Sequence, residues 1–549
     1  MILKEVKMNN SNGIDSFVFG FLILGYVILI SYLGWRGWKK TQNSKDYLLA
    51  GRSVNPFVMA MSYGAAFIST SALVGFGGIA GQFGLGVLWL VFMNIAIGIF
   101  AAFVWFGKRT RQMGAILNAK TFPEFIGKRF RAPGLKILIS LIIFVFVPLY
   151  SSVVLIGGAR FVQEIMQIPY AWALTVFAFV VAVYVIFGGL KGIMYVDALM
   201  GTVMICGMLI LLVSCYWRLG GIVPAHQALT DMAPLVKQHL PVEYALGHRG
   251  WTVMPEFNSV WWWTLVSSIM LGVGIGALAQ PQLAVRFMTV KSGRELNRAV
   301  LVGGVFILLT VGSAYTVGAL SNVFFYRTDL GIANNFQSLA IQAARGNPDL
   351  IIPIFIREAL PGVVLYLFFL TMLSAAMSTL SSLFHVTGSS IGHDFFRTVT
   401  NARHDNLTIT RTGMIFGIIL SIIFAMILPP GVVARGTAIF FGICAAAFLP
   451  AYFSALYWKG ATKTGVWASI ATGTVSSIIG LVFLHRKESA ALGICQALFG
   501  KSELISTHPW PFVDPFIYSL PLAAVVLVAV SLFSEKLPKN HISRCFKRK

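Results

Sequence analysis

The chain has 549 residues, of which 57% are hydrophobic and only 11% are charged, and its formal net charge is +23. Soluble domains carry about 25% charged residues, so this composition excludes an ordinary soluble protein. The basic residues fall in short connections between apolar segments, which argues against a nucleic-acid partner. The five cysteines show no CxxC pair and no paired spacing, so neither a disulfide framework nor a metal cluster is indicated.

The apolar segments have the length of membrane-spanning helices. Segments such as Ile14–Trp35 continue for about twenty residues without alternation, whereas barrel strands alternate over about ten. Charged residues rather than a cleavage site follow this first segment, so it is not a removable signal peptide. In chain order we predict about thirteen spans, at 14–35, 54–80, 84–107, 134–159, 171–190, 197–217, 259–285, 299–323, 360–392, 412–428, 436–457, 464–484 and 515–534.

The distribution of lysine and arginine predicts the orientation of the chain. An odd number of spans places the two termini on opposite sides of the membrane. With the N-terminus outside, 29 of the 42 lysines and arginines lie inside and 13 lie outside. Cytoplasmic connections are the ones enriched in these residues. We therefore expect a multi-pass protein of the cell membrane with an external N-terminus and a cytoplasmic C-terminus.

Three long connections fall on the predicted outer side, at about 218–258, 324–359 and 485–514. Each contains aromatic residues, prolines and some apolar periodicity. This pattern is typical of short helices that cover the outer face, and equally of ordinary loops.

Two spans combine small and hydroxyl residues at membrane depth. Residues 60–72 of span two are typical of an unwound segment whose carbonyls coordinate an ion, and equally of close helix–helix packing. In span nine, residues 375, 378, 379 and 382 lie on one helical face. Their oxygens suit sodium, a hard cation, although such hydroxyls more often bond to their own helix. Composition alone leaves both interpretations open.

Ionisable side chains are scarce at membrane depth. Asp197 lies at the start of span six, where a carboxylate is by default a functional candidate. The alternative is an interfacial residue that faces cytoplasmic water. His385 follows the hydroxyl residues of span nine, and a lone histidine there is more typical of a packed hydrogen-bond donor than of a proton relay.

Four motifs resemble those of the sodium:solute symporter family, which includes bacterial proline, pantothenate, sialic acid and sugar transporters. They are Tyr47–Arg52, Phe187–Asp197, Gln280-Pro281 with Arg286-Phe287, and Ala375–Thr379 with Asp394. Each motif is weak alone, but they occur in the family's order, on matching spans, over nearly the whole chain. The resemblance implies an all-α polytopic membrane protein with a 5+5 inverted-repeat transporter core, and a transporter rather than an enzyme.

The resemblance also divides the chain into five parts. These are an N-terminal external segment with the first helix and a cytoplasmic loop at 1–53, the first repeat at 54–217, an extracellular loop at 218–258, the second repeat at 259–457, and two C-terminal helices with a basic tail at 458–549.

One sodium site between the first and eighth core helices is implied by the same resemblance. Its donors are the carbonyls of Ala65, Ile68 and Ala375 and the hydroxyls of Ser378 and Thr379. Some members have a second sodium site, whose ligands would be Ser378, Ser381, Ser382 and Asp197. Sodium is then a co-transported ion. We expect it to join span two to span nine and to favour an outward-open state.

The solute is predicted from departures from the family's branches. Where the proline branch has an aspartate this chain has Phe67, and where that branch has aromatics it has Val273 and Ala277. The sugar branch has a polar amide at the position of Ala72. We expect a solute cavity that is more apolar than in either branch and that is lined by Phe67, Ser69, Tyr150 and Val273.

Because Phe67 replaces the aspartate of the proline branch, the site has no partner for a solute amine. It suits a solute carboxylate, whose charge would be neutralised by sodium and by half-helix N-termini. An organic acid or a pantothenate-like solute is therefore our first expectation. An amphipathic or apolar amino acid is the second.

Two other classes of function stay open. A proton-coupled or uncoupled carrier on the same fold would use His385 or Asp197 as a relay. A membrane enzyme would need a nucleophile–base pair or a metal cluster, and the nine histidines show no such grouping. The expected partners are a small-molecule solute, sodium and the lipid bilayer. The oligomeric state is not readable, because lipid-facing and partner-facing apolar surfaces look alike.

Overall fold

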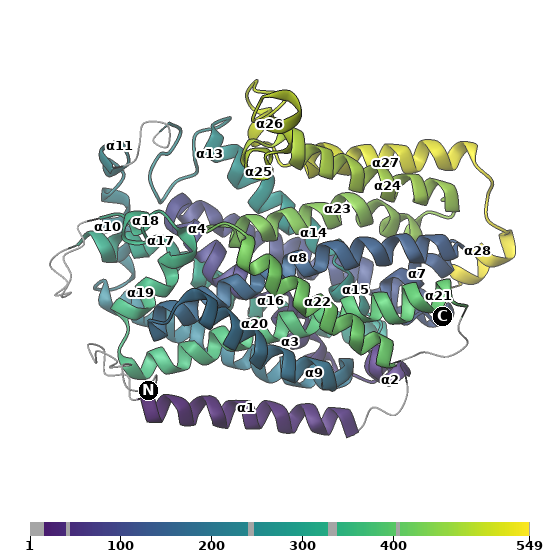
Figure 1. Ribbon diagram of the computed structural model, residues 1–549, viewed down its shortest axis with the longest axis horizontal. Coiled ribbons are helices and arrows are strands. Elements are labelled where there is room, and N and C mark those ends of the chain that lie inside the picture. Colours follow the sequence, from purple (N-terminus) through teal and green to yellow (C-terminus); the bar gives the residue numbers. More distant parts are fainter. Residues whose placement is uncertain (1–15, 40–43, 240–245, 328–337, 402–406, 548–549) are drawn as a thin grey trace.

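The computed structural model describes residues 16–39, 44–239, 246–327, 338–401 and 407–547. Within these ranges the chain forms helices and no strand, apart from an isolated bridge between Val54 and Val290. Eleven helical stretches in the described part are long and apolar enough to cross a membrane. The long helices lie side by side in one bundle (Figure 1). The prediction of an all-α polytopic membrane protein is confirmed.

The long helices follow the predicted spans, except that one helix, Tyr170–Arg218, continues without interruption through predicted spans five and six. The first part of the chain forms α1 (Ser16–Lys39), α3 (Pro56–Phe67), α4 (Phe76–Phe83), α5 (Leu88–Met93), α8 (Pro133–Met166) and α9 (Tyr170–Arg218). The second part forms α13 (Val260–Trp263), α14 (Val273–Gly276), α15 (Pro281–Arg286), α16 (Gly293–Ile307), α17 (Ser313–Tyr326), α20 (Gly362–Ser389), α22 (Leu407–Ile427) and α23 (Val433–Tyr457). The chain ends with α24 (Lys463–Ile479), α27 (Phe516–Phe533) and α28 (Lys539–Cys545).

Two predicted spans correspond to shorter pieces of apolar helix. Pro56–Phe67 is the first half of predicted span two, and its second half continues into span three within the stretch Ser71–Ile116. Predicted span five corresponds to Tyr170–Ala182. The number thirteen therefore stays a prediction, which is compatible with eleven long stretches and these two shorter helices.

The helix of predicted span two begins and stops sharply. Pro56 occupies its first turn, where the missing amide is not needed, and Asn55 caps it by accepting a hydrogen bond from the Val58 amide at 2.8 Å. At the other end Ile68 has extended dihedral angles (φ −94°, ψ 105°), and the chain resumes helical geometry at Thr70. This span is therefore broken in the interior of the protein, where all of residues 58–67 are buried.

The span that opens the second predicted repeat is broken in a comparable way. Its helix extends through α13, η5 (Thr264–Gly272), α14 and η6 (Ala277–Ala279). Gln280 then has extended angles (φ −68°, ψ 117°), and Pro281 starts the short helix α15. A proline disfavours helical geometry in the residue before it, which explains the position of this break. Interrupted helices at corresponding places in two halves are typical of inverted-repeat transporters.

The two halves meet through glycines that allow backbones to approach closely. A Cβ on Gly318 of α17 would lie 2.0 Å from the carbonyl oxygen of Gly77 in α4. A Cβ on Gly78 would lie 2.0 Å from the carbonyl oxygen of Pro348. Small residues at such contacts are the usual basis of tight helix packing in membranes. The second half of the broken span is thus held against α17 and against the connection around Pro348.

The three long connections contain short helices. That these helices cover the outer face stays a prediction. They include α10 (Ile222–Asp231), α11 (Leu235–His239), α18 (Ala340–Ala343), α19 (Ile351–Ala359), α25 (Arg486–Leu492) and α26 (Ile494–Phe499). Parts of two connections, 240–245 and 328–337, lie outside the described residues. Helices α10, α18 and α19 gather at the end of the bundle where α1 begins, and α28 lies at the opposite end (Figure 1).

Candidate functional site

The hydroxyl-bearing face of α20 meets the broken end of α3. Ser378 Oγ lies 2.9 Å from the carbonyl oxygen of Ala65, and Thr379 Oγ1 lies 3.3 Å from the carbonyl oxygens of both Ala65 and Ala66. All of these residues are buried. The predicted meeting of span two with span nine is therefore present in the structure, although the segments are more than 300 positions apart in sequence.

The carbonyl oxygens around Ser378 outnumber the hydroxyl protons that can form hydrogen bonds with them. Ser378 Oγ also lies 2.8 Å from the carbonyl oxygen of Ser374 and 3.3 Å from that of Ala375. A hydroxyl has one proton to donate and two lone pairs that accept. It can serve only one of these three carbonyls at a time. A crowd of neutral oxygens with too few protons is the environment that a small hard cation prefers.

The break in α3 leaves carbonyls at this place without helical partners. Among the described residues, no backbone amide bonds to the carbonyl oxygens of Ala65 or Ile68, because the amides that follow turn away at the extended Ile68. Ala65, Ala375, Ser378 and Thr379 are brought together directly. Ile68 is one turn further on, at the end of the helix, and no hydrogen bond joins it to α20 in the described part of the chain.

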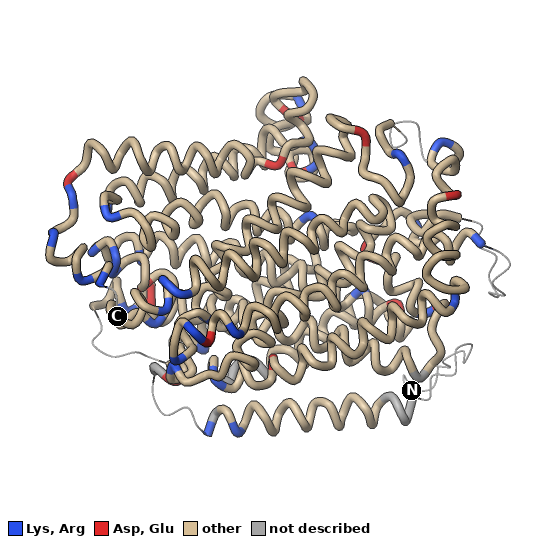
Figure 2. Tube along the Cα trace, turned by 180° about the vertical axis from the view of Figure 1, so that it is seen from behind, with Lys and Arg blue, Asp and Glu red and all other residues tan. Residues whose placement is uncertain are grey.

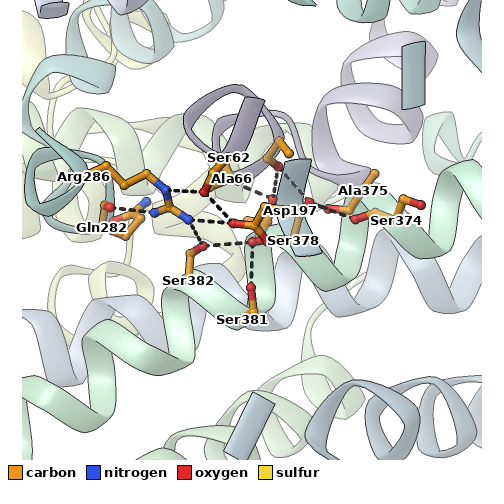
Figure 3. A network of polar contacts seen from close by, with 12 residues as sticks. Ser62, Ala66, Asp197, Gln282, Arg286, Ser374, Ala375, Ser378, Ser381 and Ser382 are labelled. Carbon is orange, nitrogen blue, oxygen red and sulfur yellow. Dashed lines mark hydrogen bonds and ion pairs between the residues drawn. The ribbon is translucent and has the colours of Figure 1, made fainter. Parts of the chain in front are cut away.

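Asp197 lies beside this cluster and forms a buried ion pair with Arg286. Arg286 Nη2 donates to Asp197 Oδ2 at 3.0 Å, and the two side chains are 1% and 0% exposed. Figure 3 shows Asp197 between this guanidinium and the hydroxyls of α20. The sequence allows two interpretations of Asp197, a functional carboxylate or an interfacial residue that faces cytoplasmic water. Its complete burial excludes the second. A carboxylate and a guanidinium taken out of water in this way are stable only as a pair.

The guanidinium also binds three neighbours from different elements. Arg286 Nε donates to Ser62 Oγ at 3.1 Å, Nη1 donates to the carbonyl of Gln282 at 2.8 Å, and Nη2 donates to Ser382 Oγ at 2.5 Å. Ser62 in turn donates to Asp197 Oδ2 at 2.8 Å. Arg286 therefore ties α15, which follows the second break, to α3, α9 and α20.

The four residues of the predicted second sodium site lie in the same network. The hydroxyls of Ser381 and Ser382 both donate to the carbonyl of Ser378, at 3.0 and 2.9 Å. Asp197 Oδ1 is buried and makes no hydrogen bond in the described part of the chain. The oxygens that would coordinate the ion thus lie in one network, but Oδ2 of Asp197 already accepts a hydrogen bond from Arg286.

Two of these residues were missed as site residues at the sequence level. Arg286 was noted only as part of a motif, and Ser62 only as one of several hydroxyls in span two. Arg286 directly follows the end of predicted span seven (259–285), and a charged residue so close to an apolar span was the available signal. Ser62 had no comparable signal, because a serine in a helix is usually bonded to its own backbone.

Three of the four predicted solute-contacting residues lie around a pair of aromatic rings on α23. The ring of Tyr150 stacks on Phe440 with centroids 4.5 Å apart, and Phe67 stacks on Phe441 at 6.1 Å. Ser69 interacts with the Tyr150 hydroxyl. The structure brings these three together, and Val273 lies on α14, which packs against α23. Phe440 and Phe441 were not predicted, because phenylalanines in an apolar span resemble ordinary core residues.

His385 is a packed hydrogen-bond donor. Its Nε2 lies 3.1 Å from the carbonyl oxygen of Tyr47, and its ring is fully enclosed. A carbonyl oxygen only accepts, so this nitrogen carries the proton. The packed-donor interpretation fits this geometry better than a proton relay.

At the end of the bundle near α28, polar contacts join η9 (Ser390–Phe396), which continues α20, to α8 and to the segment that contains α7 (Phe122–Arg129). Thr121 donates to Asp394 at 2.7 Å, and Lys136 lies 3.4 Å from the same carboxylate. Glu124 of α7 lies 3.2 Å from His393 and 2.9 Å from Lys128. Burial opposes ionisation of Glu124, but these two partners outweigh it and hold its pKa well below the usual range.

Comparison with known proteins agrees with this architecture. The sodium:solute symporter family matches residues 47–473. The sodium/pantothenate symporter of Haemophilus influenzae is 28% identical over 84% of this chain and 88% of its own length. The osmoregulated proline transporter of Bacillus subtilis is 26% identical over 83% of this chain and 87% of its own length. Sodium/proline symporter 2 of Staphylococcus saprophyticus is 26% identical, with 88% and 89% covered.

A solved structure shares the fold. The substrate-bound, outward-open structure of a sodium-coupled sialic acid symporter superposes with a TM-score of 0.70, at 15% identity, over 95% of this chain and 99% of that one. The family match spans most of the chain and includes both broken helices and the hydroxyl face of α20. The chain belongs to the sodium:solute symporter family, and it is a membrane transporter that couples solute movement to sodium rather than an enzyme.

Proposed function

We propose that this protein imports a small organic acid, of the size and character of pantothenate, together with sodium across the cell membrane. The observation that carries the proposal is the position of the oxygen cluster. The carbonyls of Ala65 and Ala66 accept from α20 on one side of the break, and Phe67 and Ser69 follow directly. A sodium ion held there would lie next to the bound solute, so that each ligand would favour the other.

The chemistry around the break favours an anion over an amine. Phe67 and the rings of α23 offer apolar surface and no carboxylate. Ser69 caps the second half of the broken helix by accepting from the Ser71 amide at 3.1 Å. The N-terminus of a helix carries a partial positive charge that stabilises a carboxylate. A solute carboxylate between this N-terminus and sodium would therefore be neutralised from two sides.

We propose that sodium is coordinated by Ala65, Ile68, Ala375, Ser378 and Thr379. In this arrangement the hydroxyls of α20 would turn their lone pairs to the ion, and their present bonds to the carbonyls would be released. We propose a second, weaker site at Ser378, Ser381, Ser382 and Asp197. Its occupation requires Arg286 to withdraw from the carboxylate, so it belongs to another conformation of the cycle.

We propose that the N-terminus is external and the C-terminus is cytoplasmic. Most of the lysines and arginines lie at the end of the bundle that carries α28 (Figure 2), which supports this orientation. The division into repeats at 54–217 and 259–457 belongs to the same proposal. Each sodium ion that moves inward then gains about 2.3 kcal/mol per 100 mV of membrane potential.

Solute and sodium are expected to stabilise the purified protein together. The apparent melting temperature in detergent should rise with pantothenate in sodium chloride, and much less with pantothenate in potassium chloride, because only the sodium form binds the solute well. Proline and a neutral sugar serve as comparison solutes. A shift of equal size in both salts would contradict sodium coupling of this solute.

Tyr150→Phe is expected to weaken solute binding while sodium dependence stays the same. The substitution keeps the ring that stacks on Phe440 and removes the hydroxyl that interacts with Ser69. A lost hydrogen bond to a bound ligand costs about 0.5–1.5 kcal/mol, so KM for uptake should rise about 2- to 13-fold. Tyr315→Phe, at another buried tyrosine, is the control. An unchanged KM would remove Tyr150 from the solute site.

A sodium/amino-acid symporter is the second candidate function, because two of the relatives are proline transporters. The substitution of a carboxylate by Phe67 in this chain speaks against it. Uptake of labelled proline and of labelled pantothenate at matched sodium concentrations separates the two. Uptake at fixed sodium and varied pH separates both from a proton-coupled carrier.

A further inference from the structure

A cavity of about 340 Å³ lies at the end of the bundle that the charge distribution assigns to the outside. It is enclosed by α4, η5 and α23 and by the connections that contain Asn347, Gly431 and Glu488. We call it the outer cavity. Nothing in the sodium site or in the Arg286 network uses it, and none of its residues was singled out from the sequence.

The outer cavity ends one helical turn above the proposed solute site. Ala438 on its wall precedes Phe441 by three residues on α23, and Ile269 precedes Val273 by four residues along the adjoining helix. Residues three or four apart lie on the same face of a helix. A solute that passes from the outside to the rings around Tyr150 would therefore cross this cavity first.

The charges on the cavity wall are unbalanced in favour of cations. Arg345, Arg435 and Lys487 line it, and Arg345 and Lys487 are exposed at its mouth. Within the described residues neither Arg345 nor Lys487 has a carboxylate in ion-pair distance. The pKa of Lys487 is lowered mainly by desolvation and secondly by the charge of Arg435, while Glu488 opposes the shift.

The two carboxylates of the cavity do not cancel this excess. Glu488 is already bonded to His485 and lies 3.7 Å from Arg435. Asp514 is 5% exposed and accepts from the Phe516 amide at 3.1 Å, at the start of α27. Both acidic groups line the cavity but already have partners, whereas Arg345 and Lys487 have no carboxylate partner among the described residues.

We propose that the outer cavity is an anion-selecting antechamber, in which Arg345, Arg435 and Lys487 concentrate a carboxylate solute before it reaches the central site. This inference rests on the proposed function. It adds a second reason for an organic-acid substrate, from a part of the molecule outside the central site. A cleft lined by one sign of charge raises the local concentration of an oppositely charged solute about 10- to 1,000-fold, and the effect falls as ionic strength rises.

A test that needs no knowledge of the solute uses charged thiol reagents. Gln82 lines the cavity, and the Gln82→Cys thiol can be reacted with an anionic and with a cationic methanethiosulfonate of similar size. The parent chain with its own five cysteines gives the background. The ratio of the anionic to the cationic rate should fall about tenfold when Arg435→Gln and Lys487→Gln are added. It should also fall as choline chloride is raised at constant sodium.

The matched control is Lys501→Gln. Lys501 is an exposed lysine of the same connection as Lys487, and it does not line the cavity. Its removal lowers the net charge by one, as Lys487→Gln alone does, and should leave the ratio within about twofold, because solvent and salt screen an exposed charge that does not line the cavity. If Arg435→Gln reduces the amount of protein at the membrane, Lys487→Gln alone gives the same comparison.

Uptake of labelled pantothenate separates this inference from the proposed function. A lower reagent ratio together with a higher pantothenate KM at unchanged maximal rate supports both. A lower ratio with no pantothenate uptake supports the antechamber and refutes the pantothenate-like substrate. The antechamber is refuted if Arg435→Gln with Lys487→Gln changes the reagent ratio no more than Lys501→Gln does. This conclusion holds whatever solute the protein transports.

Discussion

Ser378→Ala is expected to raise the sodium concentration for half-maximal uptake by about 10- to 150-fold. Ser378 Oγ lies between the carbonyls of Ala65 and Ser374, at the point where α3 and α20 meet. Loss of a polar contact to a charged group costs about 1.5–3 kcal/mol, and every 1.4 kcal/mol is a factor of ten. Thr379→Ala should act in the same direction. The measurement is initial uptake rate against sodium, with choline as the replacement cation.

The control for this prediction is Ser389→Ala on the same helix. Ser389 is also buried, but among the described residues its hydroxyl donates only to the carbonyl of Val386 in its own helix, at 3.1 Å. Its removal should leave the sodium dependence unchanged. Because solute and sodium bind with reciprocal coupling, Ser378→Ala should also raise the solute KM at low sodium and much less at saturating sodium. Normal sodium affinity in a well-expressed Ser378→Ala protein would refute the assignment of the site.

The membrane fold could be predicted because it depends on a local property of the sequence. Apolar runs of about twenty residues between basic connections mark helices individually, without knowledge of their neighbours. The break in span two was harder to predict. Small residues at 60–72 are equally compatible with an unbroken helix in close packing, and only the extended angles of Ile68 distinguish the two. The family resemblance, and not the composition, pointed to Ala65 as a free carbonyl.

The parts of the site that were not predicted depend on distant contacts. Arg286 and Asp197 are 89 positions apart, and nothing in either segment indicates the other. The same holds for Tyr150 and Phe440, whose rings stack although they belong to different halves of the chain. The charges of the outer cavity come from the segment around Arg345, the first turn of α23 and the segment around Lys487, and nothing in these segments indicates that they share a cavity. Apolar and loop residues acquire a role here only through the packing of the whole bundle.

The second large effect is expected at the Arg286–Asp197 pair. Asp197→Asn leaves a buried guanidinium without its counter-charge, and Arg286→Gln leaves a buried carboxylate. Removing one partner of a buried ion pair lowers the free energy of unfolding by about 3–5 kcal/mol. Each single variant should therefore melt at a clearly lower temperature in detergent. The double variant Asp197→Asn with Arg286→Gln should lose less than the sum of the two, since it leaves no unpaired charge.

Sodium should distinguish the two single variants. In Arg286→Gln the group that loses its partner is a carboxylate in the same network as Ser381 and Ser382 (Figure 3), and a cation that enters there replaces the missing charge. In Asp197→Asn the group that loses this carboxylate is itself a cation, which sodium cannot neutralise. The melting temperature of Arg286→Gln should thus rise with sodium more than with potassium, and that of Asp197→Asn should respond to the two salts alike. Equal responses in both variants would mean that Asp197 is only a partner of Arg286 and not a sodium ligand. A selective response would show that the guanidinium and a second sodium ion compete for the same carboxylate, so that the movement of Arg286 controls when that ion binds.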